Sequence, residues 1–290
     1  SLISLSEKLG NRKREARFYS DVAGQANIHT PAIYFNGVDM LTGHPILVME
    51  DMGNYRQGDS VKGCSLYDAR SAIVELGNFH SYWWDNDRLD ALDWVPLRDS
   101  ETDIYREIYP EAWRSFLEKS GDNITGYLKD IGGKLPDQIP HVKKELARPP
   151  RTLLHGDYRL DNCFLGASEK YSSIAIFDWE YCAKGRGVFD VATFICEAFP
   201  PVERRANEMS LLGLYFDTLI ENGILGYSMD QCIFDYRLAM LDVFVFWVVT
   251  GGYCDFEDDR GSVFLKNALR RFDAAIKDLE CEELLPGFLV

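Results

Sequence analysis

Two aspartates and an asparagine near the middle of the chain have the residue types and spacing that phosphoryl transfer requires. Asp157 and Asn162 lie five residues apart in a polar stretch, and Asp178 follows the apolar run 174–177. In phosphoryl transfer, one carboxylate orients the attacking hydroxyl and accepts its proton, while oxygen ligands hold Mg²⁺ on the phosphates. These three residues are therefore candidates for a phosphotransfer site.

Short apolar runs and amphipathic helices surround this polar cluster and must position it. The runs 152–154 and 174–177 are predicted as strands on either side of a loop. A hairpin is predicted from 32–37 and 46–49, and the polar, Gly-rich run 51–63 is predicted as a loop between two lobes. Helical periodicity predicts helices over 11–24, 65–84, 103–119, 122–131 and most of the chain after 188, with breaks at Pro200-Pro201, Gly223, Gly226 and Gly251-Gly252.

Composition limits the functional class and the partners. The 290 residues carry a net charge of −15, and no cluster of Lys and Arg outweighs the surrounding acids, so a nucleic-acid partner is not expected. The seven cysteines are scattered without a Cys-x-x-Cys pair, which indicates the cytoplasm or another reducing intracellular compartment. The most apolar stretch, 238–250, is too short to span a membrane and contains Asp242, so we expect a core helix there.

The candidate residues lie within longer motifs that resemble a known group of enzymes. Residues 153–162 run Leu-Leu-His-Gly-Asp-Tyr-Arg-Leu-Asp-Asn, and residues 178–180 are Asp-Trp-Glu. The His-Gly-Asp start resembles the aminoglycoside phosphotransferase and choline kinase superfamily, and protein kinases share its Asp-x4-Asn spacing. Further motifs are similar to the ecdysteroid-kinase-like branch of that superfamily: Gly-Asp-x-x-x-Gly-Cys-Ser at 58–65, a Leu/His helix ending in Trp at 76–84, Trp-x-Pro at 94–96 and Gly-x-Gly-x-x-Asp-x-Ala at 185–192.

The resemblance implies a fold, cofactors and a role for each motif residue. The fold would be protein-kinase-like, bilobal and α+β, with a truncated N-terminal lobe over 1–53 and a mainly helical C-terminal lobe over 54–290. The cofactors would be ATP and Mg²⁺. The implied roles are catalytic base for Asp157, Mg²⁺ ligands for Asn162 and Asp178, support of the loop for His155 and Asp190, an adenine-binding hinge for Glu50 and Met52, and pairing with a phosphate-binding lysine for Glu15.

One part of the family pattern is missing from the sequence. The family has a glycine-containing hairpin and a strand lysine before the Glu15 helix, and here residues 1–11 precede it; Lys8 and Lys13 match the lysine by type alone. Two explanations stay open: the sequence is a fragment of a longer chain, or the natural chain lacks this segment. The main hypothesis is an ATP-dependent phosphotransferase acting on a small-molecule hydroxyl. The alternative is a catalytically degenerate kinase fold that serves as a binding or structural subunit for a protein partner.

Several other side chains have two possible interpretations. His80 lies on the apolar face of its helix and is predicted to be a core histidine. Trp83 and Trp84 could form the floor of an acceptor pocket or belong to the core, and both interpretations stay open. Three acidic features could attract a cation, although a solvated face explains the last more simply: Glu180, Glu197 and the run 255–259.

Overall fold

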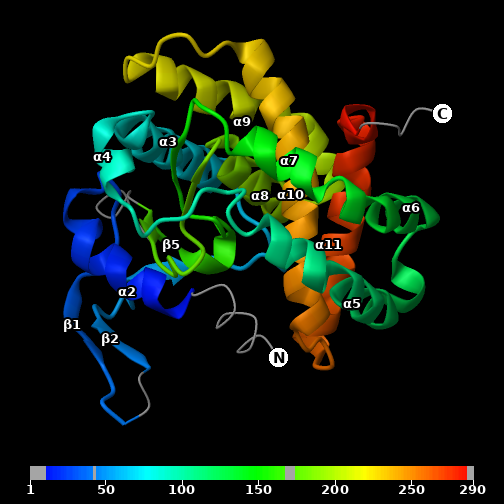
Figure 1. The fold of residues 1–290 in the computed structure, drawn as a ribbon, viewed down its shortest axis with the longest axis horizontal. Coiled ribbons are helices and arrows are strands. Elements are labelled where there is room, and N and C mark those ends of the chain that lie inside the picture. The colour runs from blue at the N-terminus through cyan, green and yellow to red at the C-terminus, as the bar shows by residue number, and fades with distance from the viewer. Residues whose placement is uncertain (1–10, 42–43, 167–173, 286–290) are drawn as a thin grey trace.

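The chain folds into a small β-rich end and a larger helical body (Figure 1). The computed structural model describes residues 11–41, 44–166 and 174–285. At the β-rich end, helix α2 (Arg12–Asp21) packs against an antiparallel hairpin of β1 (Ile33–Val38) and β2 (Pro45–Met49). This arrangement confirms the predicted first helix and hairpin. Residues 42 and 43 of the turn, and the candidate lysine Lys8, lie outside the described residues.

Two small antiparallel sheets carry the polar cluster at the ends of their strands. The first pairs β4 (Thr152–Leu154) with β7 (Ala183–Gly185), and the second places β5 (Cys163–Gly166) between β3 (Tyr55–Gln57) and β6 (Ala175–Ile176). Strands β4 and β6 are confirmed, whereas β3 lies in a segment predicted as loop, and β5 and β7 are not predicted. Strands this short cannot show alternation, so pairing with distant segments defines them. The lobe boundary at residue 53 stays a prediction.

Most of the described chain after residue 64 is helical, as the periodicity predicts. Ser65 begins α3 (Leu66–Trp83) because its hydroxyl accepts the backbone N–H of Asp68 at 3.1 Å. The later helices, of which the first and the fourth are not predicted, are α4 (Asp87–Ala91), α5 (Thr102–Ser120), α6 (Gly126–Lys134), α7 (Ile139–Leu146), α8 (Val188–Ala198), α9 (Pro201–Glu221), α10 (Met229–Tyr253) and α11 (Asp259–Asp278). Short 3₁₀ turns are η1 (Ala23–Gln25), η2 (Gly121–Asn123), η3 (Leu135–Asp137), η4 (Leu160–Asn162) and η6 (Cys281–Leu284).

Helix α10 runs through the helical body, and its apolar stretch is buried as predicted. Gly251 and Gly252 lie in its last turn and the helix ends at Tyr253, so the predicted break at this pair falls one residue before the observed helix end. A Cβ on Gly252 would lie 2.6 Å from the carbonyl oxygen of Ala112, and the glycine therefore allows α10 to approach α5 closely. Among the described helices, none combines the length and the apolar character needed to cross a membrane.

A buried ion cluster accommodates Asp242 within this apolar helix. The Arg98 Nε donates to Asp242 Oδ2 at 2.7 Å, and the Lys143 Nζ lies 2.9 Å from Asp242 Oδ1. All three side chains are at most 5% exposed. Burial lowers the pKa of Lys143 to about 8. Burial opposes ionisation of Asp242 too, but the two cations hold its pKa below the ordinary value. We call Arg98, Lys143 and Asp242 the closed cluster.

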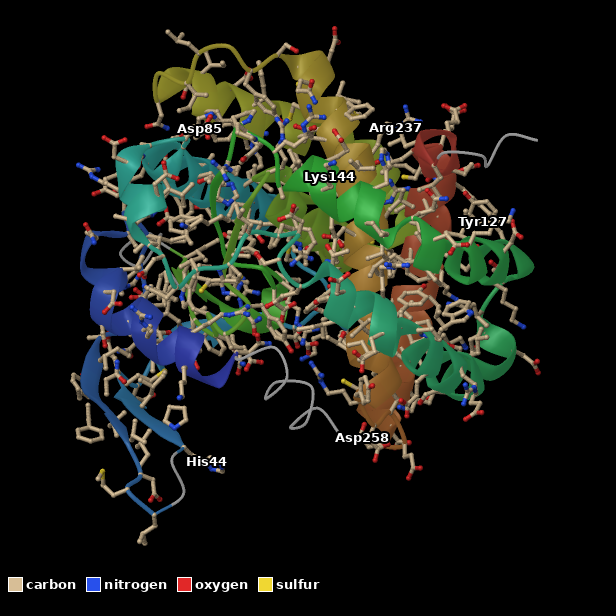
Figure 2. The ribbon with its side chains drawn as sticks, viewed as in Figure 1. His44, Asp85, Tyr127, Lys144, Arg237 and Asp258 are labelled. Atoms are coloured by element: carbon tan, nitrogen blue, oxygen red, sulfur yellow. The ribbon has the colours of Figure 1, made fainter. Side chains whose placement is uncertain are left out.

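The end of the described chain is attached to the helical body by side chains labelled in Figure 2. Tyr127 of α6 donates through its hydroxyl to Glu282 Oε2 at 2.7 Å, and Arg237 of α10 donates to two backbone carbonyls just after α11. Asp258 caps α11 because its carboxylate accepts the backbone N–H of Gly261. The acidic run 255–259 therefore has a structural role in addition to its solvated face.

Candidate functional site

Helix α8 fixes the backbone of the His-Gly-Asp segment. Asp190, buried in the first turn of α8, accepts the backbone N–H of His155 at 2.7 Å and that of Gly156 at 2.9 Å. His80 of α3 lies 3.3 Å from the same carboxylate, and burial lowers the pKa of this histidine. Hydrogen bonds from two successive backbone N–H groups to one carboxylate hold the loop firmly, so Asp157 has a fixed position.

Gly156 and His155 complete the turn that leads into Asp157. Gly156 has a φ of 86°, and a Cβ there would lie 2.1 Å from the carbonyl oxygen of Tyr181, so the turn requires glycine. The His155 Nε2 lies 2.9 Å from the Phe177 carbonyl, and the backbone N–H of Asp157 donates to His155 Nδ1 at 3.2 Å. The tautomer with its proton on Nε2 satisfies both contacts. His155 therefore links the His-Gly-Asp loop to the segment that carries Asp178.

The loop brings Asn162 back onto Asp157. The Asn162 Nδ2 donates to the Asp157 backbone carbonyl at 2.9 Å and to Asp157 Oδ2 at 3.0 Å. The backbone carbonyl of Asn162 accepts the Phe177 N–H at 3.2 Å, which places Asn162 beside the strand that leads to Asp178. Because the Asn162 amide uses its N–H groups on Asp157, its side-chain oxygen is left as a possible ligand for a cation.

Asp178 lies next to these two residues with an unusual backbone conformation. Its φ of 66° falls in the left-handed region, which costs on the order of 1 kcal/mol for a non-glycine residue and is common at functional sites. Burial and the charge of Asp157 raise the pKa of Asp178. Two carboxylates held together repel each other, and a bound cation relieves this repulsion. In the described ranges, no three His, Cys, Asp or Glu side chains form a metal site, but Mg²⁺ commonly takes one or two protein ligands together with phosphate oxygens.

Glu15 reaches the same place from the β-rich end. Its carboxylate accepts hydrogen bonds from the backbone N–H groups of Trp179 and Asp178. Burial and the nearby Asp178 charge raise the pKa of Glu15 to about 7. Phe18 of the same helix stacks on Trp179 with ring centroids 3.7 Å apart, so α2 is attached to the Asp178 segment. Lys13, a candidate partner by type, is exposed on α2.

The segment after β2 leaves two backbone groups unpaired within the described residues. The Glu50 N–H donates to the Ala32 carbonyl at 2.8 Å, and the Met52 carbonyl accepts the Tyr55 N–H at 2.8 Å. The Glu50 carbonyl and the Met52 N–H make no such bond. An acceptor and a donor two residues apart match the donor and acceptor on one edge of an adenine base.

A cavity of about 190 Å³ opens beside Asp157, against α10. Its wall is largely aromatic and includes Tyr181, Phe246 and Trp247, while Asp157, Arg159 and Glu180 supply polar groups. Neither tryptophan at the end of α3 lines it: Trp83 is buried in the core and Trp84 packs against the core. The structure therefore decides the open question about these two residues in favour of the core.

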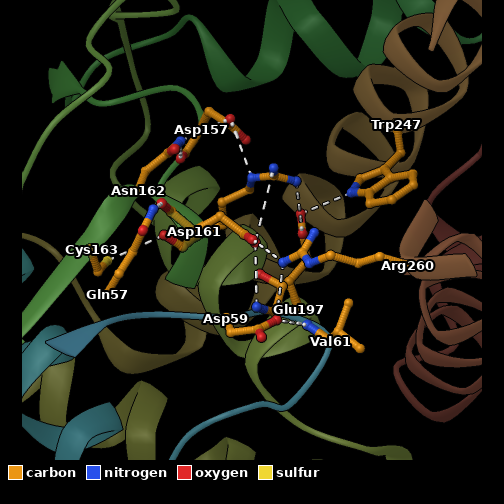
Figure 3. A network of polar contacts seen from close by, with 12 residues as sticks. Gln57, Asp59, Val61, Asp157, Asp161, Asn162, Cys163, Glu197, Trp247 and Arg260 are labelled. Atoms are coloured by element: carbon orange, nitrogen blue, oxygen red, sulfur yellow. Dashed lines mark hydrogen bonds and ion pairs between the residues drawn. The ribbon is translucent and has the colours of Figure 1, made fainter. Parts of the chain in front are cut away.

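Arg159 belongs to the loop that begins with His-Gly-Asp, and it contacts Glu197 of α8. Its neighbours Asp157, Asp161 and Glu197 are labelled in Figure 3. Its guanidinium nitrogens face three carboxylate oxygens at 3.6, 3.9 and 3.6 Å, those of Asp157, Asp161 and Glu197. The Trp247 Nε1 also donates to Glu197 Oε1 at 2.8 Å, and burial raises the pKa of Glu197 to about 7. The cation that Glu197 faces is thus a residue of the chain itself. We call Arg159 and its three carboxylate neighbours the open cluster.

A second arginine joins the loop that carries Asp157 and Asp161 to the polar segment around Asp59. The Arg260 Nη2 of α11 donates to Asp59 Oδ1 at 3.0 Å and to Asp161 Oδ1 at 2.9 Å, and the Ser60 N–H donates to Asp161 Oδ2 at 3.3 Å (Figure 3). Arg260 is 57% exposed and does not line the cavity. This contact therefore attaches two loops to each other and leaves Asp157 untouched.

Sequence reasoning missed Arg159 and the aromatic wall of the cavity. The signal for Arg159 is its place two residues after Asp157, but its other partners come from distant helices. Asp190 and Glu197 are seven residues apart on a predicted helix, a spacing of about two turns that puts both on one face. In the structure both residues contact the loop around Asp157, Asp190 through the backbone of His155 and Glu197 through Arg159. The aromatic wall has no comparable signal, because it mixes residues of the loop after Asp178 with residues of α10 and α11.

Solved structures with the same architecture are phosphotransferases. They include a putative aminoglycoside phosphotransferase from Ralstonia eutropha (TM-score 0.56, 16% identity, 93% of this chain and 84% of that chain) and Plasmodium vivax ethanolamine kinase (TM-score 0.54, 19% identity, 91% and 71%). A third is aminoglycoside 2'-phosphotransferase-IIIa, solved as a GDP complex (TM-score 0.53, 13% identity, 93% and 84%). At these identities the likeness establishes the fold, which is protein-kinase-like and α+β as predicted.

The family follows from the sequence match. The model of the ecdysteroid kinase-like family matches residues 13–224, which is more than two thirds of the chain and includes Asp157, Asn162 and Asp178. The chain belongs to the ecdysteroid kinase-like family, which confirms the resemblance of its motifs. A search among curated proteins finds no match.

Proposed function

We propose that the protein is an ATP-dependent phosphotransferase that phosphorylates a hydroxyl group of a small molecule. The observation that carries the proposal is the convergence of three side chains. The Asn162 amide is hydrogen-bonded to Asp157, and Asp178 lies close enough to Asp157 for the charge of Asp157 to raise the pKa of Asp178. The names of the structural neighbours, an ethanolamine kinase and aminoglycoside phosphotransferases, support a small-molecule acceptor. The cavity beside Asp157 offers space for one.

In the proposed reaction, Asp157 accepts the proton of the acceptor hydroxyl while the hydroxyl oxygen bonds to the terminal phosphorus of ATP. The bond from that phosphorus to its bridging oxygen breaks, and ADP leaves. Asn162 holds Asp157 through Oδ2, which leaves the other carboxylate oxygen to face the hydroxyl. Asp190 and His155 keep the loop in place, so the base needs no rearrangement.

In this proposal the oxygens of Asn162 and Asp178 hold Mg²⁺. Bound there, Mg²⁺ neutralises charge on the phosphates. The Glu50 carbonyl and the Met52 N–H bind the adenine edge. Glu15 fixes the Asp178 segment through its backbone and is available to pair with a phosphate-binding lysine.

Asp157→Asn is the test of the catalytic assignment. The variant keeps the size of the side chain and an acceptor oxygen for Asn162 but removes the base. We expect kcat to fall about 10²- to 10⁴-fold, with little change in Mg·ATP affinity. ADP release is measured with a panel of hydroxyl-bearing small molecules, and Mg·ATP affinity by calorimetric titration. Asp178→Ala is the matched variant, and it should lose Mg·ATP binding.

Two outcomes would contradict the proposal in different ways. Undiminished phosphorylation of an acceptor by the Asp157→Asn variant would show that Asp157 is not the base. A folded wild-type chain that fails to bind Mg·ATP and co-purifies stably with a large partner would support the alternative. In that case the fold serves as a binding or structural subunit.

A further inference from the structure

Arg159 is surrounded by carboxylates but hydrogen-bonded to none of them. Its nearest contacts to Asp157 and Glu197 are 3.6 Å, and to Asp161 3.9 Å. Guanidinium–carboxylate hydrogen bonds normally measure about 2.7–2.9 Å. Its Nε is buried without a hydrogen-bond partner in the part of the chain that the structure describes. The five N–H donors of this side chain are therefore largely available to a ligand.

Glu197 explains why the guanidinium does not close onto Asp157. Glu197 lies on the buried helix α8, and its other oxygen accepts the Trp247 Nε1–H at 2.8 Å, so its own position is fixed. It attracts Arg159 from one side while Asp157 attracts it from the other. The guanidinium of Arg159 also lies over the Phe264 ring, with its Cζ 5.2 Å from the ring centroid. The side chain is thus held between two acids, with 24% of it exposed.

The location limits what such a ligand can be. Arg159 and Asp157 line the same cavity, and in the proposed reaction the terminal phosphoryl group must come to Asp157. Asp157, Asp161, Asp178 and Glu197 all contribute negative charge around Arg159, which disfavours a phosphate unless cations offset them. A guanidinium matches the geometry of phosphate oxygens with paired donors, better than an ammonium does.

We propose that Arg159 is a phosphate-binding residue whose guanidinium donates to the terminal phosphoryl oxygens of the bound nucleotide. The assignment rests on the proposed function, because it requires a nucleoside triphosphate in this cleft. Glu197 and Trp247 are positioning residues in this assignment: they hold Arg159 off Asp157, so that Asp157 is free to accept a proton. Arg159 thereby adds positive charge where the transferred group develops negative charge.

The test compares two nucleotides that differ in the terminal phosphate. The Mg²⁺ complexes of ADP and of AMP-PNP, a non-hydrolysable ATP analogue, are titrated calorimetrically into the wild-type chain and into Arg159→Gln. We expect the wild type to bind AMP-PNP more tightly than ADP. Arg159→Gln should weaken AMP-PNP binding about 10- to 100-fold and change ADP binding less than about threefold. Arg159→Lys keeps the positive charge but loses the paired donors of the guanidinium. Its affinity for AMP-PNP should lie between those of the wild type and Arg159→Gln.

Arg260→Gln is the matched control, since Arg260 also contacts Asp161 but does not line the cavity. It should keep the wild-type ratio of the two affinities, and thermal unfolding checks that each variant is folded. Equal weakening of both nucleotides by Arg159→Gln, or no weakening of either, would overturn the assignment while nucleotide binding itself stands. A wild-type chain that binds neither nucleotide would instead contradict the proposed function, and the assignment with it.

Discussion

Two clusters in this molecule each place an arginine beside carboxylate groups, but the distances and the exposure of the side chains differ. In the closed cluster, Arg98 bonds to Asp242 at 2.7 Å, and no side chain is more than 5% exposed. In the open cluster, the shortest contact of Arg159 is 3.6 Å and a quarter of the side chain is exposed. Arg98 donates through Nε to a carboxylate within the fold, while no carboxylate of the described residues lies within hydrogen-bond distance of the Arg159 guanidinium.

The difference follows from where the partners come from. Asp242 lies on α10, Lys143 on α7 and Arg98 before α5, so three separate segments aim their side chains at one point. In the open cluster, three of the four members alternate along one loop, in the order Asp157, Arg159, Asp161. Glu197, the fourth member, comes from α8 and also stays 3.6 Å from Arg159. Side chains from three packed segments therefore form short contacts in the closed cluster, while the open cluster, built mainly on one loop, leaves its guanidinium without one.

Asp242→Asn should have the largest effect on stability, because it leaves Arg98 and Lys143 buried without their counter-ion. Removing one partner of a buried ion pair typically costs about 3–5 kcal/mol. We expect the free energy of unfolding, measured by urea denaturation at neutral pH, to fall by that amount. A loss below about 1 kcal/mol would mean that the closed cluster contributes no more to the free energy of unfolding than we expect of the open cluster.

Glu197→Gln tests the open cluster through pH. The pKa of Glu197 is raised from 4.5 to about 7 in the folded chain, so between these values the folded state binds more protons than the unfolded state. The free energy of unfolding of the wild type therefore falls as pH rises through this window, by about 3 kcal/mol at most. Gln cannot titrate, and it keeps an oxygen for Trp247.

The measurement is the difference in unfolding free energy between Glu197→Gln and the wild type, from denaturant titrations at pH 5, 6, 7 and 8. Other groups titrate in both proteins and cancel in this difference. We expect the variant to gain relative to the wild type as pH rises, with most of the gain complete just above pH 7. A flat difference would show that Glu197 is ionised throughout and that Arg159 is paired more tightly than the distances indicate.

The parts of the fold that sequence predicts are those that local chemistry determines. Helical periodicity is enough for α3 and α5, and the spacing of Asp157, Asn162 and Asp178 is enough to identify the candidate site. Both signals lie within short windows of the chain. The prediction of a loop over 51–63 fails at β3, because this strand forms by pairing with the distant β5. The close approach of Gly252 to Ala112 likewise has no local signal in the sequence.

The pairing of charged groups in the two clusters could not be predicted from the sequence either. Asp242 is visible in the sequence as an acid within an apolar helix, but its cations come from other segments. Arg159 is visible beside Asp157, but its freedom depends on Glu197 and Trp247, which only the packing of α8 and α10 brings together. The sequence therefore identifies the charged groups, while three-dimensional packing decides which of them form short ion pairs.

Arg159→Gln sharpens the comparison when it is set against Arg98→Gln. Removing Arg98 should lower the free energy of unfolding by several kcal/mol, because the buried Asp242 then keeps Lys143 as its one cationic partner in the cluster. Removing Arg159 should change the free energy of unfolding by less than about 1 kcal/mol, since its contacts are long and Glu197 can take up a proton near neutral pH. Urea denaturation of both variants at pH 7 gives the comparison. Similar losses in the two would show that both arginines are primarily structural.

Arg260→Gln should have the smallest effect, although its ion pairs of 2.9 and 3.0 Å are shorter than those of Arg159. Arg260 is 57% exposed, and exposed pairs contribute about 0–1 kcal/mol because water and salt screen them. We expect a loss of about 0.5 kcal/mol at low salt, measured by urea denaturation, that shrinks further at 0.5 M NaCl. A loss above about 2 kcal/mol that salt does not reduce would show that distance, more than burial, decides the strength of these clusters.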